Sequence, residues 1–95
     1  MKTMEVAQIN KRGTWVMNFS KGSLLRFLDR VEVELTNARN KAENAGLMDT
    51  EDYLDGVVGQ LYHYRDQIKS GNDSVELRNS IRMTCKYASK VAQMV

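Results

Sequence analysis

Residues 24–45 read LLRFLDRVEVELTNARNKAENA. Apolar residues recur in this stretch at alternating steps of four and three, which is the spacing of a heptad repeat. Residues three and four apart share one face of an α-helix, so they form a continuous apolar stripe that another element must cover. The stretch therefore predicts one long helix that packs against others. The stripe consists of Leu24, Leu28, Val31, Leu35, Ala38, Ala42 and Ala45.

The residues that flank this stretch predict where the helix begins and ends. Ser20 or Ser23 can cap the N-terminus, because each hydroxyl can accept a hydrogen bond from a free amide of the first turn. Gly46 is expected to end the helix, since glycine adopts the left-handed backbone found after helix C-termini.

Two later stretches carry matching stripes. The second helix is expected to begin at Asp49 or Thr50 and to end before Gly71, and Asp73 or Ser74 is expected to cap a third helix. Short connections between three amphipathic helices favour an antiparallel three-helix bundle, which is the predicted fold. The second stripe is Leu54, Val57, Leu61, Tyr64 and Ile68, and the third is Leu77, Ile81, Thr84, Ala88, Val91 and Val95, with Cys85 on its flank.

The N-terminal residues have a different pattern. Residues 6–9 and 14–19 are rich in β-branched and aromatic side chains, and a four-residue segment that ends in Gly13 separates them. This pattern predicts a short β-hairpin or an extended arm. We therefore expect a single domain over residues 1–95, with the hairpin or arm at 1–22 and the helical bundle at 23–95.

Composition places the chain among globular proteins. Hydrophobic residues make up 42% of the chain and charged residues 27%, and charged residues interrupt every apolar run, which excludes a membrane span. The single cysteine, Cys85, excludes an internal disulfide. We therefore expect no membrane association and a cytoplasmic location in a bacterial host.

No residue set forms a recognised catalytic or metal-binding motif. His63 is the only histidine, and Asp66 beside it gives at most a two-ligand site. Cys85 lacks the partners that would activate a nucleophile. We therefore expect no enzyme activity, no metal and no cofactor. An acidic cluster near the start of the second helix spreads over different helix faces and is explained by the helix dipole: Asp49, Glu51, Asp52 and Asp55.

Four basic residues of the third helix are spaced by four, which predicts a slowly winding basic row on the side away from the apolar stripe. The row is either a surface for phosphates or an acidic protein partner, or a solvated helix face. The hairpin tip can extend it if the hairpin lies beside this helix, and core packing is the favoured interpretation for Trp15. The candidate partner-binding residues are Arg78, Arg82, Lys86, Lys90, Lys11, Arg12 and Trp15.

Other residues predict self-association. Gly56 and Gly59 lie three apart in the second helix, which suggests a close crossing with another backbone, either within the bundle or at a subunit contact. The third stripe continues through Val91 to Val95, so the C-terminal end needs a covering surface. A chain of this length often completes its core by forming an oligomer. We therefore expect a homo-oligomer with contacts at these four residues.

The chain has many methionines and tyrosines, no proline and no catalytic motif. In length and general character it resembles the small accessory proteins of bacteriophages, and among them the epsilon antirepressors of P4-type satellite phages. The resemblance implies binding to a helper-phage repressor and loss of that repressor's operator binding. It covers the overall pattern of the chain, includes no motif and transfers no binding residue.

Two functions follow as expectations. The first is a small non-enzymatic regulator that binds and inactivates another protein, most specifically a phage antirepressor that sequesters a transcriptional repressor. The second is a nucleic-acid or nucleotide-binding protein that uses the basic row, with Tyr87 or Trp15 as a stacking surface.

Overall fold

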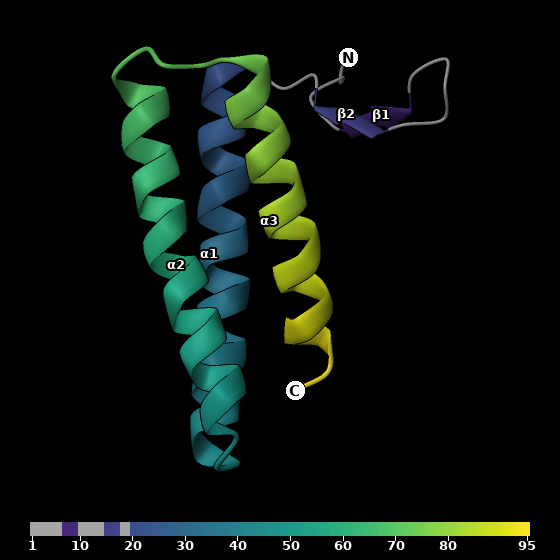
Figure 1. Cartoon of the computed structure of the whole chain (residues 1–95), viewed down its shortest axis with the longest axis vertical. Coiled ribbons are helices and arrows are strands. Elements are labelled where there is room, and N and C mark those ends of the chain that lie inside the picture. The colour runs from purple at the N-terminus through teal and green to yellow at the C-terminus, as the bar shows by residue number, and fades with distance from the viewer. Residues whose placement is uncertain (1–6, 10–14, 18–19) are drawn as a thin grey trace.

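Three helices form the bundle. The computed structural model describes residues 7–9, 15–17 and 20–95. Helix α1 spans Lys21–Asn44, α2 spans Met48–Lys69 and α3 spans Val75–Gln93. The chain runs along α1, returns along α2 and reverses again into α3, so neighbouring helices are antiparallel (Figure 1). This arrangement confirms the predicted three-helix bundle.

Serine hydroxyls cap two of the helices. The Ser20 hydroxyl accepts a hydrogen bond from the amide of Ser23 at 3.2 Å, so Ser20 is the cap of α1. At the start of α3, the Ser74 hydroxyl accepts from the amide of Leu77 at 3.1 Å. Each bond satisfies one of the amides that a helix N-terminus leaves without a partner.

Glycines form the two connections between the helices. Gly46 follows α1 with φ of 74°, and Gly71 follows α2 with φ of 93°, both in the left-handed region that glycine adopts without strain. Helix α2 begins at Met48, one residue before the predicted start, and Leu47 at its cap provides no side-chain hydrogen bond. The predicted caps Asp49 and Thr50 are therefore already inside the helix.

The core follows the predicted stripes with two corrections. Leu35 is fully buried, but Ala45 is exposed because it lies beyond the end of α1. In α3, Cys85 is a core residue and Thr84 is half-buried at the edge facing α2, which reverses their predicted places. The buried hydrophobic cluster is Leu24, Leu28, Val31, Leu35, Ala38, Leu54, Val57, Leu61, Tyr64, Ile68, Leu77, Ile81, Cys85 and Ala88.

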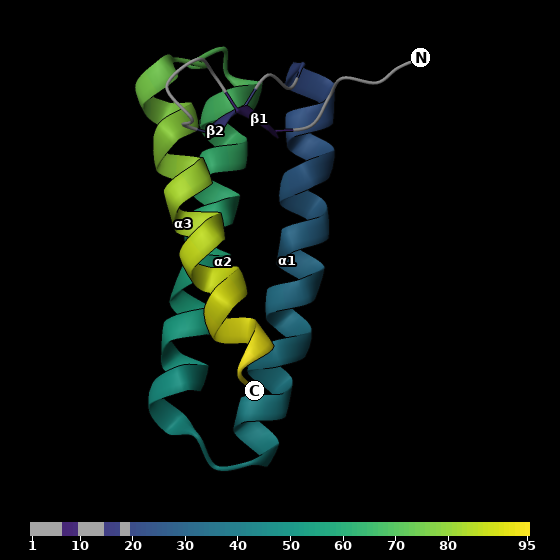
Figure 2. The same ribbon diagram turned by 90° about the vertical axis from the view of Figure 1, so that its right-hand side faces the viewer.

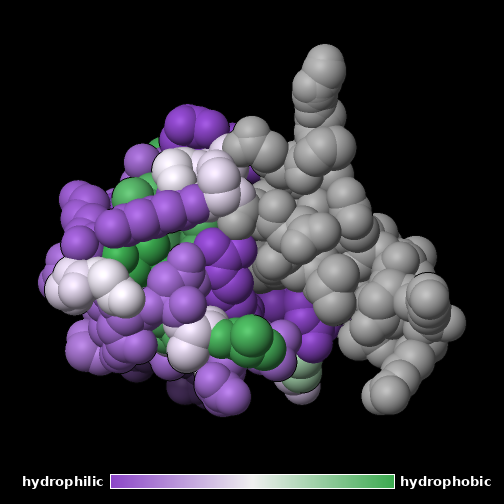
Figure 3. Space-filling view, turned by 90° about the horizontal axis from the view of Figure 1, so that it is seen from above, coloured by the Kyte–Doolittle hydropathy of each residue, from purple (hydrophilic) through white to green (hydrophobic). Residues whose placement is uncertain are grey.

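Helix α3 is shorter than α1 and α2. The pair of helices formed by α1 and α2 extends past the C-terminal end of α3 in both side views (Figures 1 and 2). Leu47 and Met48, where α1 connects to α2, are exposed. Seen from above, hydrophilic side chains cover most of the described surface, with apolar ones scattered among them (Figure 3).

Two short strands precede the bundle. Strand β1 spans Ala7–Ile9 and strand β2 spans Trp15–Met17, and they pair antiparallel with Ala7 opposite Met17. Strand β2 lies beside α3. Lys11 and Arg12 of the predicted basic surface lie outside the described residues.

An ionic cluster joins α1 to α2. Arg65 of α2 forms ion pairs with Asp29 and Glu32 of α1, the second at 2.8 Å. The Tyr62 hydroxyl donates a hydrogen bond to Glu32 at 2.6 Å, and the Arg65 guanidinium lies over the Tyr62 ring. The hydrogen bond from Tyr62 and the bond from Arg65 lower the pKa of Glu32.

A pH dependence of stability follows from this cluster. Because the pKa of Glu32 is lower in the folded state, its contribution is present above the ordinary value of 4.5 and is lost as the pH falls through the folded value. Tyr62→Phe removes the largest cause and is expected to lower the melting temperature at about pH 7. In thermal unfolding curves, the difference from wild type should be smaller at about pH 3 than at about pH 7, because the contribution of Glu32 is lost progressively as the pH falls below 4.5.

Tyr87→Phe is the matched control, because Tyr87 is exposed and the structure gives its hydroxyl no hydrogen bond among the described residues. A Tyr62→Phe deficit of equal size at both pH values would contradict the assigned role of Glu32.

Candidate functional site

The predicted basic row lies on the flank of α3 that is near α1. The Ser89 hydroxyl of α3 lies 3.4 Å from the Glu34 carboxylate of α1, which marks this flank. At 100° per residue, Arg82 and Lys86 project from the same side of α3 as Ser89. The row therefore lies on this flank at the half-buried Arg82 and winds about 80° around the helix to the exposed Lys90.

Arg78 does not belong to the accessible part of this row. Its guanidinium forms two hydrogen bonds with the Asp73 carboxylate, at 2.6 Å from Nε and 2.8 Å from Nη2. This pair lowers the pKa of Asp73. Asp73, which was predicted as a possible cap of α3, binds this arginine instead.

The other three residues of the row have no acidic partner. Within the part of the chain that the structure describes, no carboxylate lies within 4.0 Å of Arg82, Lys86 or Lys90. Lys86 and Lys90 are exposed, whereas Arg82 is half-buried and its Nε atom has no hydrogen-bond partner. The structure thus presents three consecutive turns of α3 with unneutralised positive charge.

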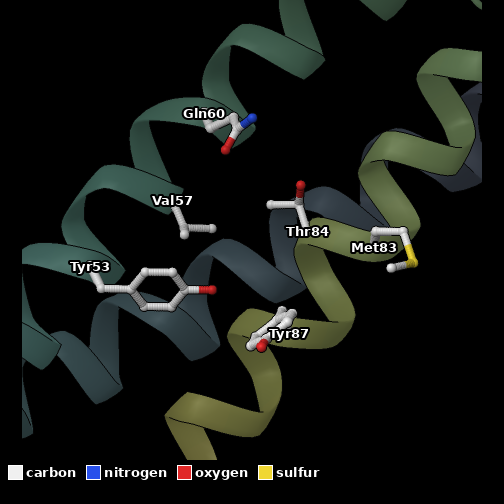
Figure 4. Close-up of a pocket in the computed structure, with 6 residues that line it drawn as sticks. All are labelled: Tyr53, Val57, Gln60, Met83, Thr84 and Tyr87. Atoms are coloured by element: carbon white, nitrogen blue, oxygen red, sulfur yellow. The ribbon is translucent and has the colours of Figure 1, made fainter.

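An open pocket of about 360 Å³ lies on the other flank of α3, between α3 and α2. Tyr53 and Val57 point from α2 toward α3, where Thr84 faces them (Figure 4). Tyr64 closes one side, since its hydroxyl lies 3.1 Å from that of Thr84. The pocket is lined by Tyr53, Val57, Gln60, Met83, Thr84 and Tyr87.

Sequence analysis did not identify this pocket as a site. Met83 and Tyr87 are four apart, so they share one flank of α3, and both are exposed. That spacing is the only feature of the local sequence that indicates the pocket, because the opposite wall of the pocket comes from α2. Tyr87 lies about 140° around α3 from Arg82 but is three residues from Lys90, so it neighbours only the last residue of the row, and its use as a stacking surface stays a prediction.

The pocket has the chemistry of a binding surface. Burial, and next the nearby Tyr87, raise the pKa of Tyr53, so its hydroxyl stays neutral at neutral pH. The six lining residues include no carboxylate, lysine, arginine, histidine or cysteine. The pocket therefore offers apolar contacts and neutral hydrogen-bonding groups.

The residues considered for catalysis are not brought together. Cys85 is 3% exposed, and burial raises the pKa of its thiol to about 12. His63 is exposed on α2. Among the residues that the structure describes, no group of three histidine, cysteine, aspartate or glutamate side chains is arranged to hold a metal ion.

The acidic cluster of α2 divides into two pairs. Glu51 and Asp55 form ion pairs with Arg39 of α1 at 3.2 and 3.3 Å, so they join the two helices. Asp49 and Asp52 are exposed and form no ion pair with the described residues. The second pair therefore carries no ion pair with the described residues, whereas Asp55 of the first pair is paired although its side chain is 66% exposed.

The predicted oligomer contacts have different environments. Gly56 and Gly59 are exposed, and a Cβ atom built on either would meet no atom within 4 Å. A close crossing within the bundle is therefore wrong, because no atom of α1 or α3 lies within 4 Å of the position a Cβ would take. A subunit contact stays a prediction. Val91 and Val95 are half-buried and pack against the core.

Among the described residues, no helix is both long enough and apolar enough to cross a membrane. No protein-family model, curated protein or solved structure gives a significant match to the chain.

Proposed function

We propose that the protein is a small non-enzymatic regulator that binds an acidic surface of another protein through Arg82, Lys86 and Lys90. One observation carries this proposal. The bundle neutralises Arg39, Arg65 and Arg78 with carboxylates, but on three consecutive turns of α3 these cations have no carboxylate within 4.0 Å among the described residues. We name them the basic row.

The basic row can supply both speed and specificity of association. Like charges on consecutive turns of one helix repel one another, and an acidic partner relieves that repulsion. A complementary potential steers the encounter and excludes partners of the wrong sign. Hydrogen bonds from a charged donor to a carboxylate contribute roughly 1.5–3 kcal/mol each when they are shielded from water.

A transcriptional repressor is the partner class that we propose, and the support for it is the general resemblance to phage antirepressors. A surface that reads DNA is itself basic, so the basic row would meet an acidic surface elsewhere on the repressor. Binding would then draw the repressor into a form that does not hold its operator, by mass action and without catalysis.

The experiment starts from a pull-down with the tagged protein in a bacterial lysate treated with nuclease. The captured protein is then purified and titrated against wild type and Arg82→Glu/Lys86→Glu. Reversal of two charges should weaken binding by at least about tenfold. It should leave the fold intact, because both side chains lie outside the buried core.

Lys41→Glu/Lys69→Glu is the matched control, since it makes the same change in net charge with exposed lysines of α1 and α2. If both variants weaken binding to the captured protein equally, the effect comes from net charge alone, and the basic row has no place in the proposal. Two results together would favour the nucleic-acid alternative. The pull-down would recover nucleic acid that disappears on nuclease treatment, and the logarithm of the binding constant would fall with the logarithm of salt concentration with a slope of about −2.7, as expected for three phosphate contacts.

A further inference from the structure

The face formed by α2 and α3, opposite α1, carries exposed apolar side chains on its α3 half. Tyr87 is 67% exposed, Met83 is 52% exposed and Met94 is 84% exposed. They are four and seven residues apart, so they project from one side of α3. Together with the pocket beside them, they form a raised apolar strip rather than scattered surface residues.

The α2 half of this face has a gap at Gly56, between the exposed side chains of Tyr53 and Gln60. Tyr53 and Tyr87 line one pocket, and so do Gln60 and Met83. Because α2 and α3 are antiparallel, Gly56 lies between these two levels, beside the large side chains of α3. With no atom within 4 Å of a Cβ built there, this part of α2 has open space in front of it.

The two halves of the face also carry opposite charges at the end where α2 begins and α3 ends. Asp49 and Asp52 are exposed on α2, and Lys90 is exposed on α3. None of the three forms an ion pair with the described residues. At this end, the α2 half of the face thus carries two acidic side chains and the gap at Gly56, while the α3 half carries a basic side chain and the larger apolar ones.

We propose that a second copy of this chain docks on this face, with the two-fold axis parallel to the helices. That symmetry places α2 of one subunit opposite α3 of its partner. Gly56 then receives the bulky side chains of the partner's α3, and Asp52 approaches the partner's Lys90, each contact occurring twice. A two-fold axis across the helices would instead place glycine against glycine and tyrosine against tyrosine, which fits neither shape.

The size of the face indicates a modest affinity. The shared length of α2 and α3 is about 28 Å for the 19 residues of α3, and two packed helices are about 20 Å wide. The face therefore presents roughly 560 Å² per subunit, below the ~800 Å² of a standard interface. An interface of this size is in the range of weak, transient complexes.

This inference does not rest on the proposed function, although the two share one residue, Lys90. Arg82 and Lys86 project from the flank near α1, so they stay accessible in the dimer. Two-fold symmetry would present Arg82 and Lys86 twice, and a dimeric target would then gain from simultaneous binding.

Sedimentation velocity over a concentration series, with matched salt, tests the proposal on wild type, Asp52→Lys, Lys90→Glu and an equimolar mixture of the two variants. Each single variant repels itself at both symmetric contacts, so its dissociation constant should rise at least about tenfold. The mixture should restore the dimer, because the reversed residue of one subunit faces the opposite reversed residue of its partner.

Gly56→Gln provides a separate steric test. The added side chain has free space in the monomer and improves helix propensity, so the variant should melt at or above the wild-type temperature yet remain a monomer. Three results would overturn the proposal: a wild-type monomer at every concentration, a dimer that Gly56→Gln leaves unchanged, or a mixture that dimerises no better than its components. Failure here leaves the titration of the basic row unaffected.

Discussion

Leu35→Asp is expected to unfold the protein. Leu35 is fully buried in the middle of α1 and belongs to the core that α2 and α3 complete. Removing a buried leucine side chain costs about 2–5 kcal/mol, and placing a carboxylate in apolar surroundings adds several more. A domain of this size has a total stability of about 5–15 kcal/mol, so this one substitution should exceed or nearly exceed it.

Val33→Asp is the matched control. It introduces the same carboxylate by replacing a β-branched residue two positions away in α1, where the side chain is 61% exposed. Far-ultraviolet circular dichroism should show helical, cooperatively melting Val33→Asp and a largely unfolded Leu35→Asp. A folded Leu35→Asp with a wild-type melting temperature would contradict the assignment of the core.

The helices could be predicted from the sequence because their signals are local. The stripe that contains Leu35 requires only that apolar residues recur every three or four positions, and the ends at Ser20 and Gly46 depend on the chemistry of one residue each. The exchange of Thr84 and Cys85 could not be predicted in the same way. Both fit the period of α3, and the rotation of that helix against two neighbours decides which one is buried.

The candidate site was predictable only in part. The spacing by four identified the basic row, but whether each cation is neutralised depends on contacts that spacing does not contain. Arg78 binds Asp73, which lies before α3, whereas Lys86 has no such neighbour. The pocket was not predictable, because its walls join residues such as Tyr53 and Tyr87 that only the packing of α2 on α3 brings together.

Cys85 is expected to resist thiol reagents until the protein unfolds. The reactive species is the thiolate, and burial raises the pKa of Cys85 from an ordinary 9.0 to about 12. At about pH 8 this change lowers the thiolate population roughly a thousandfold, and the closed core blocks the reagent as well. Labelling of wild type should therefore be at least ~1000-fold slower than labelling in denaturant, when followed by the absorbance of an aromatic disulfide reagent.

The matched control moves the thiol to the surface of the same helix. Cys85→Ala/Ser80→Cys places it at an exposed position and should label within the mixing time or shortly after it. Fast labelling of folded wild type would contradict the buried position, and with it the rotation of α3 that places Met83 and Tyr87 on the outer face.

The same thiol predicts a loss of stability at alkaline pH. The raised pKa means that Cys85 stabilises the fold fully below the ordinary value of 9.0. As the pH rises from there toward about 12, the unfolded chain releases a proton that the folded chain retains. Stability should therefore fall more steeply through this range in wild type than in Cys85→Ala, because other groups titrate equally in both. Parallel curves of melting temperature against pH for wild type and Cys85→Ala would contradict this prediction. They would show that the thiol ionises as readily in the folded bundle as in the unfolded chain, although Cys85 lies at the centre of the buried stripe of α3.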